Sequence, residues 1–345
     1  MFLNQIKNLS KSAPYRNFIL NKIERIFLRS SFFSLPIVIQ LELTNLCNLS
    51  CKTCGHSYWD KEKNSPKFLS VDLLKRYEFL YKTCSEFLLG GYGEPLLNKS
   101  FVEILDWCKR DPNKLVTIIT NGTLLEDKIS FLKKVDIVTF SMDGIHQVYE
   151  HHRDISFTKI HKGLEIFRSV YPNKRIHVNV VWNKKTDQNL YKLVNFLNDY
   201  QIEQVNLLPE KIYSLDRQDE CLFEAKDLHD IYMKLQDIKN STSIKINHPN
   251  FLKAEQVCNQ PLDSIFILSD GEIMACCSAI FKGSNERFSL GYFAGNLKED
   301  FQSFMNQEKM IEYRKARLQK KPYGSLCENC AFRKVQKSYL NRSLN

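Results

Sequence analysis

Three cysteines lie in one short segment with the spacing Cys47-x3-Cys51-x2-Cys54. The chain has eleven cysteines in 345 residues, for which chance gives roughly 0.01 such triplets. Three thiolates can hold three corners of a [4Fe–4S] cube and leave the fourth iron open to a small molecule, whereas ferredoxin-type cubes use four cysteines. The alternative is a closed zinc site with His56 as its fourth ligand.

A second group of cysteines lies near the C-terminal end of the chain: Cys258, Cys276, Cys277, Cys327 and Cys330. Short spacing between cysteines is typical of metal ligation rather than of disulfide pairing. This group therefore predicts a second metal centre, and a zinc ribbon is the alternative.

The elements that must position these cysteines follow from alternating apolar runs and helical patterns. Strands are expected at 37–44, 86–91, 115–120, 136–141, 175–182 and 204–208. Helices are expected between them near 70–83, 100–109, 126–134, 156–170 and 188–200. This alternation indicates βα units and a parallel sheet. In barrels of such units, ligands bind at the carboxyl ends of the strands, which is where the first cysteine group lies.

The next three strands end in glycine-rich or polar motifs. Gly91-Tyr92-Gly93-Glu94-Pro95 follows the second strand, Thr120-Asn121-Gly122 the third, and Ser141-Met142-Asp143-Gly144 the fourth. Glycine lets a ligand approach the backbone closely. Taken singly, the three motifs also fit an ordinary turn, an Asn-Gly turn and a helix N-cap.

Together with the first cysteine group, these motifs make residues 36–215 resemble the radical S-adenosylmethionine (SAM) enzymes. The resemblance implies an α/β fold with a partial (β/α)6 TIM-like barrel. It also implies that Cys47, Cys51 and Cys54 hold a [4Fe–4S] cluster whose open iron binds SAM. In this family, reduction cleaves SAM to a 5′-deoxyadenosyl radical, which abstracts a substrate hydrogen.

The resemblance further implies a set of SAM contacts at the strand ends. These residues are Gly91, Tyr92, Gly93, Glu94, Asn121, Ser141, Asp143 and Asn179. Tyr92 stands where the Gly-Gly-Glu motif of the family has its first glycine, which costs little where the contacts are made by the main chain.

The C-terminal cysteines resemble a truncated SPASM domain of the twitch type, a small α+β domain with one auxiliary [4Fe–4S] cluster. The resemblance rests on Cys258, Gly271-x4-Cys276 and Cys327-x2-Cys330, with no cysteine after Cys330. It implies Cys258, Cys276, Cys327 and Cys330 as the ligands. Cys277 is a candidate hydrogen donor to a substrate radical.

Four segments are expected: a basic helical extension at 1–35, the barrel at 36–215, a linker helix at 216–243 and the twitch-like domain at 244–345. The apolar spacing from Phe18 to Phe27 in the extension is helical. We interpret this extension as a helix packed on the barrel. The alternative is a basic amphipathic helix that makes peripheral contact with an anionic membrane.

Composition narrows the partners and the compartment. The net charge of +10 fits a solvated basic surface, an anionic substrate or an acidic electron donor of the flavodoxin or ferredoxin type. No nucleic-acid partner is expected, because no RNA-binding module is recognisable. No apolar run is long enough to cross a bilayer and no signal peptide is recognisable, so we expect a cytoplasmic protein.

The function expected from the resemblance is that of a radical SAM oxidoreductase, a dehydrogenase or an epimerase. Its substrate is expected to be small and polar: a sugar, an aminocyclitol or a nucleotide-linked sugar. The alternative is a radical SAM maturase that modifies a peptide or protein side chain. A third interpretation, a zinc- or cluster-bearing scaffold protein, is not enzymatic.

Overall fold

The computed structural model describes residues 12–59, 65–211, 220, 227–249, 258–277, 288–324 and 327. The chain has an α/β fold consistent with a partial (β/α)6 barrel, and it divides into two compact units. Unit 1 comprises Met1–Leu46, Ser65–Thr117 and Val257–Leu326. Unit 2 comprises Cys47–Asn64, Ile118–Gln256 and Cys327–Asn345.

The sheet of unit 1 is built around β1 (Val38–Leu41). Strand β1 pairs in parallel with β2 (Glu86–Leu89) on one side and with β8 (Ser264–Ile267) on the other. The chain then turns back from β8 into the antiparallel β9 (Glu272–Met274), beside which lies β10 (Ser289–Tyr292). Gly271, with φ of 88°, allows this turn. The C-terminal segment thus adds strands directly to β1.

Unit 2 contains a parallel run of four strands. These are β4 (Ile137–Ser141), β5 (Arg175–Trp182), β6 (Gln204–Pro209) and β7 (Lys245–Asn247). Strand β3 (Leu115–Thr120) crosses the boundary between the two units along the chain.

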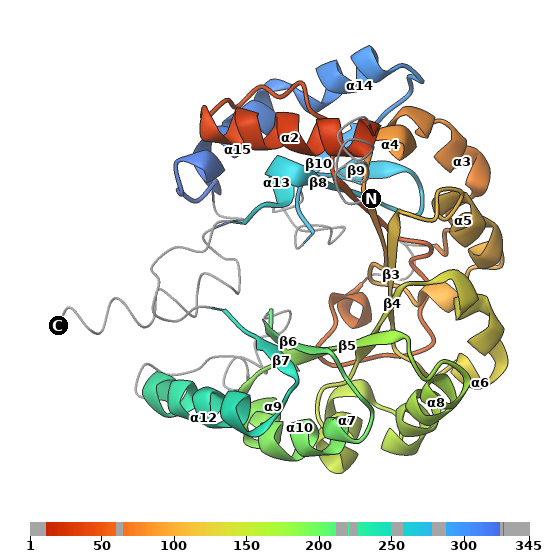
Figure 1. The fold of residues 1–345 in the computed structure, drawn as a ribbon, viewed down its shortest axis with the longest axis vertical. Coiled ribbons are helices and arrows are strands. Elements are labelled where there is room, and N and C mark those ends of the chain that lie inside the picture. Colours follow the sequence, from red (N-terminus) through yellow and green to blue (C-terminus); the bar gives the residue numbers. More distant parts are fainter. Residues whose placement is uncertain are drawn as a thin grey trace, which may run out of the picture. The chain divides into compact units, whose positions relative to one another are not determined.

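Helices follow the strands in each unit (Figure 1). Unit 1 has α2 (Ala13–Ile26), α3 (Val71–Lys75), α4 (Glu78–Thr83), η2 (Pro95–Leu97), α5 (Phe101–Cys108), α13 (Gln260–Asp263), α14 (Lys298–Met305) and α15 (Glu308–Leu318). Unit 2 has η1 (Gly55–Tyr58), α6 (Leu125–Lys128), η3 (Ile129–Lys134), α7 (His146–Arg153), α8 (Phe157–Val170), α9 (Lys184–Gln188), α10 (Leu190–Asn198) and α12 (Asp227–Ser241).

Short polar side chains start several of these helices. Ser12, Ser70 and Ser156 accept a backbone N–H in the first turns of α2, α3 and α8. Asn183 forms a capping box with Thr186 at the start of α9. Such caps satisfy backbone donors that have no partner within the helix.

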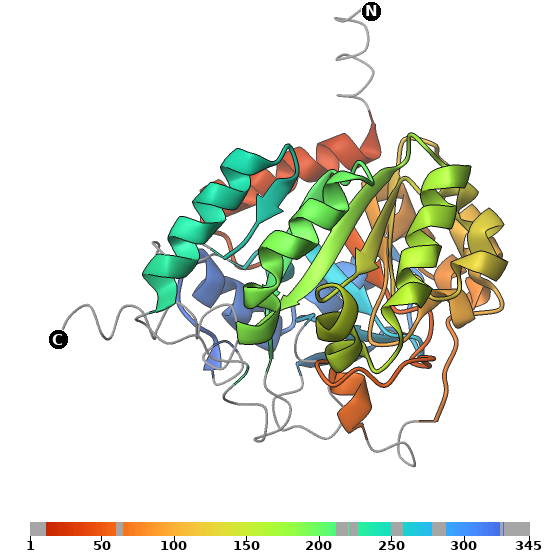
Figure 2. The same ribbon diagram turned by 90° about the horizontal axis from the view of Figure 1, so that it is seen from below.

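Strand β5 has one covered and one more open face. Ile176, Val178, Val180 and Trp182 are fully buried, whereas the residues between them are not. Helices α8 and α10 lie on one side of β5 and β6 (Figures 1 and 2). Because side chains alternate between the faces of a strand, the half-buried residues such as Asn179 lie on the face away from these helices.

All six strands predicted from the sequence are present, with β1 shorter than expected. Near the end of unit 1 the chain forms two successive helices, α14 and α15. They separate at Asn306, whose side chain bonds the backbone of Phe32 at 2.9 and 2.7 Å. Helix α7 had no counterpart in the sequence analysis. The predicted segment boundaries remain predictions.

In the described part of the chain, no helix has the length and apolar character needed to cross a membrane.

Candidate cluster and cofactor site

The segment with Cys47, Cys51 and Cys54 lies in unit 2 and forms a compact loop. The Cys54 N–H donates to the Cys51 carbonyl at 3.1 Å, and the Ser57 hydroxyl donates to the same carbonyl at 2.8 Å. The Lys52 N–H donates to the His152 carbonyl at 2.9 Å. The loop is therefore anchored to the end of α7.

A buried ion pair lies beside this loop. Arg153 Nε is 2.6 Å from Asp143 Oδ2, and these side chains are 11% and 0% exposed. Arg153 Nη1 approaches Cys51 Sγ at 3.8 Å, while Asp143 Oδ1 accepts the Val181 N–H at 2.7 Å. Asp143, which ends the fourth-strand motif, thus holds a guanidinium against the second cysteine of the loop.

The cysteine thiols are perturbed mainly by burial. The pKa of the Cys54 thiol is raised to about 12, mainly by burial and to a smaller extent by the neighbouring thiols of Cys51 and Cys47. Burial also raises the pKa of Cys51, which the charge of Arg153 partly offsets. Because iron binds thiolates, loading a cluster here must release these protons. Cys51 and Cys47 both lie close enough to Cys54 to affect the charge of its thiol, as ligands of one cluster would.

A single tetrahedral zinc ion fits these sulfurs poorly. In zinc sites with Zn–S of about 2.3 Å, the sulfurs lie about 3.8 Å apart. Among the described residues, only His151, His152 and Glu220 have three ligand atoms all within 4.8 Å of one another. The Lys185 ammonium lies there instead, 2.9 Å from His151 Nε2 and 3.0 Å from Glu220 Oε1. The sulfurs of Cys47, Cys51 and Cys54 are therefore not all within 4.8 Å of one another. This spacing is wider than a single zinc ion needs and favours a cube.

Asn121, at the end of β3, contacts the cysteine loop. Its amide donates to Asn48 Oδ1 at 2.9 Å, and its Oδ1 accepts from the Thr123 backbone at 3.0 Å and hydroxyl at 2.7 Å. The Asn48 amide donates in turn to the Thr123 hydroxyl at 2.9 Å. Asn121 therefore connects the third-strand motif to the loop.

The Gly91–Glu94 motif lies in unit 1 and packs tightly against the end of β1. A Cβ on Gly93 would lie 2.0 Å from the Thr44 carbonyl oxygen. A Cβ on Gly91 would lie 2.6 Å from Cγ of Glu42. The Glu94 carboxylate is buried and accepts the Leu96 N–H at 3.2 Å. Both glycines are required by the close approach of chain segments.

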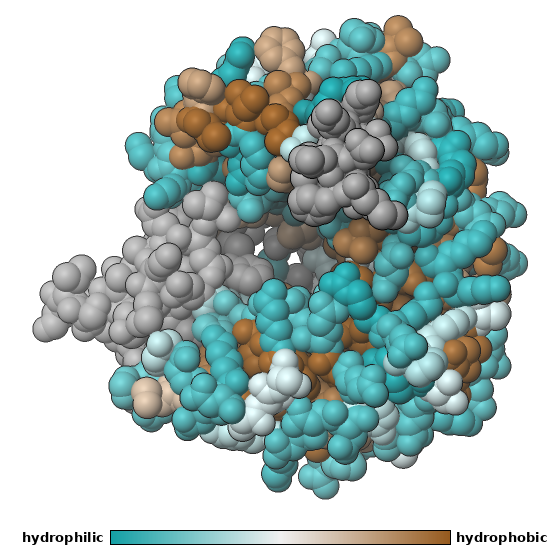
Figure 3. All heavy atoms as spheres, in the orientation of Figure 1, coloured by the Kyte–Doolittle hydropathy of each residue, from teal (hydrophilic) through white to brown (hydrophobic). Residues whose placement is uncertain are grey.

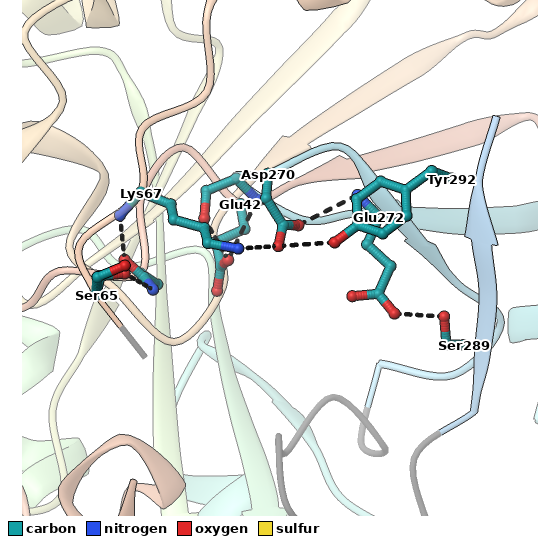
Figure 4. A network of polar contacts seen from close by, with 9 residues as sticks. Glu42, Ser65, Lys67, Asp270, Glu272, Ser289 and Tyr292 are labelled. Carbon is teal, nitrogen blue, oxygen red and sulfur yellow. Dashed lines mark hydrogen bonds and ion pairs between the residues drawn. The ribbon is translucent and has the colours of Figure 1, made fainter. Parts of the chain in front are cut away.

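Glu42, which was not among the candidate residues from the sequence, connects the Gly91–Glu94 motif to the turn after β8 in unit 1. Its carboxylate accepts from the Ser269 hydroxyl at 2.9 Å and from the Tyr92 N–H at 3.3 Å. Burial raises its pKa above the ordinary value. Figure 4 shows Glu42 beside Asp270, which pairs with Lys67 at 2.6 Å and accepts the Tyr292 hydroxyl at 3.2 Å.

Ser141 and Asn179 lie side by side at the open face of unit 2. Ser141 ends β4 and pairs in register with Asn179. Asn179 Oδ1 accepts the Asn206 amide at 2.9 Å, and Asn206 Oδ1 accepts the Asn247 amide at 3.1 Å. The three asparagines form a row across β5, β6 and β7, which we call the amide row.

The C-terminal cysteines are only partly described. Cys276 is buried and follows β9, whereas Cys258 and Cys277 are exposed, and all three belong to unit 1. Cys327 is buried and is grouped with unit 2. Cys330 lies outside the described residues. The auxiliary ligand set therefore stays a prediction.

Two residues at the sites escaped the sequence analysis for different reasons. Arg153 is the last residue of α7. The sequence feature that could have identified it is its place after two histidines, ten residues beyond Asp143. Glu42 was included in an apolar strand run. A single carboxylate at the carboxyl end of a barrel strand was the available signal, because such ends face ligands.

Comparison with known families decides what kind of site this is. The model of the radical SAM superfamily matches residues 41–197, and the model of the SPASM iron–sulfur cluster-binding domain matches residues 258–331. The chain belongs to the radical SAM superfamily. Radical SAM and SPASM domains imply [4Fe–4S] clusters, so this radical SAM enzyme uses SAM, a SAM-binding cluster and an auxiliary cluster.

Several proteins are similar to this chain. It is 28% identical to the GTP 3′,8-cyclase of Mannheimia succiniciproducens over 202 residues, 56% of this chain and 58% of the cyclase. It is 26% identical to the radical SAM cyclopropyl synthase TigE of Paramaledivibacter caminithermalis over 309 residues, 80% of this chain and 62% of TigE. The chain thus spans about three fifths of these relatives.

A solved structure shares the fold. Native anSMEcpe with bound AdoMet and a Cp18Cys peptide superposes with a TM-score of 0.62 at 18% identity, covering 90% of this chain and 97% of anSMEcpe. The radical SAM and SPASM assignments confirm the family and fold expected from the sequence.

Proposed function

We propose that this radical SAM enzyme abstracts a hydrogen atom from a small polar substrate and thereby oxidises or epimerises it. Reductive cleavage of SAM at the first cluster supplies the 5′-deoxyadenosyl radical for this reaction. We assign Cys47, Cys51 and Cys54 to that cluster and Cys258, Cys276, Cys327 and Cys330 to the auxiliary one. We place the reaction in the cytoplasm, with a flavodoxin- or ferredoxin-type electron donor.

The observation that carries the proposal for the substrate is the amide row. Each carboxamide offers both donors and acceptors, and the three side chains are half-buried on the face of β5–β7 away from the helices. Gln204 extends the row, since its amide donates to Asn206 Oδ1 at 2.8 Å. A continuous strip of amides suits a substrate rich in hydroxyl groups better than an apolar one.

The chain's charged residues have a separate task in this proposal. Asp143 orients Arg153 through the 2.6 Å ion pair, and Arg153 supports the cysteine loop at Cys51. We assign Gly91, Tyr92, Gly93, Glu94, Asn121, Ser141, Asp143 and Asn179 to the surroundings of SAM. Cys277, which is exposed, is our candidate hydrogen donor for epimerisation.

The test is deuterium transfer into 5′-deoxyadenosine. The reconstituted, reduced protein is incubated with SAM and a set of perdeuterated sugars, aminocyclitols and nucleotide sugars, and 5′-deoxyadenosine is analysed by mass spectrometry. We expect label from at least one of them. Asn206→Leu should raise the KM for that compound while SAM cleavage without substrate continues. The control Asn113→Leu, at an exposed position, should leave both the KM and SAM cleavage as in the wild type. Transfer from none of them contradicts the proposal.

A peptide or protein substrate is the second candidate. It is favoured by the fold shared with anSMEcpe, whose solved structure holds a bound Cp18Cys peptide. The two candidates separate when a lysate of deuterated cells is divided by ultrafiltration. Label arising from the low-mass fraction supports the first candidate, and label arising from the protein and peptide fraction supports the second.

A further inference from the structure

Helix α2 is oriented with its polar face inward. Asn17, Asn21 and Glu24 are its buried residues. The Asn17 amide donates to the Leu35 carbonyl at 2.9 Å, and the Asn21 amide donates to the Leu262 carbonyl at 2.6 Å. The Glu24 carboxylate accepts the Ser34 hydroxyl at 2.6 Å. These bonds fix the rotation of the helix about its axis within unit 1.

The opposite face of α2 and the turn after it are apolar and open. We call this surface the α2 apolar face; its exposed residues are Phe18, Ile19, Ile23, Ile26, Phe27 and Phe33. Ile26 and Phe27 are each 74% exposed. Figure 3 shows hydrophobic residues gathered over α2. A helix of a globular protein normally turns such a face to the core, and a contiguous exposed patch marks an interaction site.

Within residues 12–33, the charged side chains that are exposed are all cations. Arg16, Lys22 and Arg29 are exposed. Lys22 Nζ lies 5.1 Å from the centre of the Phe18 ring, and Arg29 Cζ lies 5.1 Å from that of Phe33. Between residues 12 and 33 the one acidic residue is Glu24, which is buried. The exposed surface of this segment is therefore apolar and positively charged.

We propose that the α2 apolar face docks on an anionic lipid bilayer. Its aliphatic and aromatic side chains enter the boundary between headgroups and acyl chains, while the three cations bind lipid phosphates. Interfacial helices combine these two contributions, and long basic side chains keep their charge at headgroup level while their stems lie in apolar surroundings.

The charge pattern disfavours two other occupants. A second copy in a two-fold dimer would bring the same face against itself, which places Arg16, Lys22 and Arg29 near their own copies. Residues 1–11 carry two lysines and no acidic residue, so they offer no negative charge either. Anionic lipid phosphates supply the negative charge that complements this face.

Vesicle flotation of the full-length, reconstituted protein tests this proposal. The vesicles are phosphatidylcholine with or without about one quarter phosphatidylglycerol. We expect binding to the anionic vesicles that weakens with salt. The Ile23→Ser/Ile26→Ser/Phe27→Ser variant should lose at least about tenfold in affinity. Lys22→Gln and Arg29→Gln should each lose about fivefold.

The matched control carries Val170→Ser, Tyr191→Ser and Met233→Ser, three exposed apolar residues on α8, α10 and α12; it should bind like the wild type. All variants should keep SAM cleavage, which shows that they fold. Equal binding to neutral vesicles, or full binding by the Ile23/Ile26/Phe27 variant, overturns the proposal. A wild-type dimer that this variant converts to a monomer also overturns it and makes a second copy the occupant.

Discussion

Different interactions hold two strand-end segments in place. These are the cysteine loop of unit 2 and the Gly91–Glu94 segment of unit 1. The cysteine loop depends on charge, since the buried pair of Asp143 and Arg153 supports it at Cys51. The glycine segment depends on space, because it lies against the backbone of Thr44 and the side chain of Glu42.

This difference indicates how each segment should respond to change. A buried ion pair is vulnerable to the loss of either partner, because the other charge then remains in an apolar environment. A glycine packed against backbone is vulnerable to any added atom, because backbone cannot move aside cheaply. The predictions below test this contrast, beginning with the largest effect.

Cys51→Ala should abolish formation of 5′-deoxyadenosine, because two thiolates cannot hold the cube with one iron exposed. The measurement is 5′-deoxyadenosine released by the reduced, reconstituted protein. Cys108→Ala is the matched control, since Cys108 is a buried cysteine on α5, and this variant should remain active. Full SAM cleavage by Cys51→Ala would show that the cluster lies elsewhere.

Asp143→Ala should destabilise the protein by about 3–5 kcal/mol, because it leaves the Arg153 guanidinium buried without its carboxylate. Urea unfolding measures the loss. Replacing both residues, Asp143→Ala with Arg153→Met, should cost less than the sum of the single changes. Asp127→Ala, at an exposed position on α6, serves as the control. Additive single and double variants would mean that the pair is not coupled.

Gly93→Ala should cost about 3 kcal/mol of unfolding free energy, since its Cβ would meet a backbone oxygen. Gly91→Ala should cost less, because the atoms it meets belong to the side chain of Glu42. Each variant is thus the control for the other in thermal unfolding. The reverse order would refute the view that backbone packing dominates at this segment.

The smallest effect concerns the pH dependence of Glu42. Burial raises its folded-state pKa above 4.5, so the folded state binds the proton more tightly than the unfolded chain. Wild-type stability should therefore decline, relative to Glu42→Gln, as the pH rises from 4.5 through the folded-state pKa. Melting temperatures of both proteins across this range measure it. A constant difference would mean that Glu42 titrates as in the unfolded chain.

The sequence predicts the strands and the cysteine loop well, because both are local patterns. The runs at 115–120 and 175–182 coincide with β3 and β5, since an apolar run between turn residues needs little context. The sequence does not predict the ion pair between Asp143 and Arg153, because this pair depends on how α7 folds back beside β4. The cost of burying a charge depends on its partner, which sequence spacing does not identify.

Helix α2 shows a different limit. Its periodicity correctly predicts a helix over the region from Phe18 to Phe27, yet periodicity alone does not say which face points inward. The usual expectation turns the apolar face to the core. Here the polar face makes the contacts with unit 1 through Asn17, Asn21 and Glu24.

The position of β8 beside β1 has a consequence for synthesis of the chain. Strand β1 is complete once the ribosome has passed Leu41, but its parallel neighbour on one side ends only at Ile267. Until then, that edge of β1 offers unpaired backbone groups, which are a template for association with other chains. Translation at about 5–20 residues per second leaves the edge open for tens of seconds at the slower end of this range. We therefore expect chains truncated before residue 264 to aggregate.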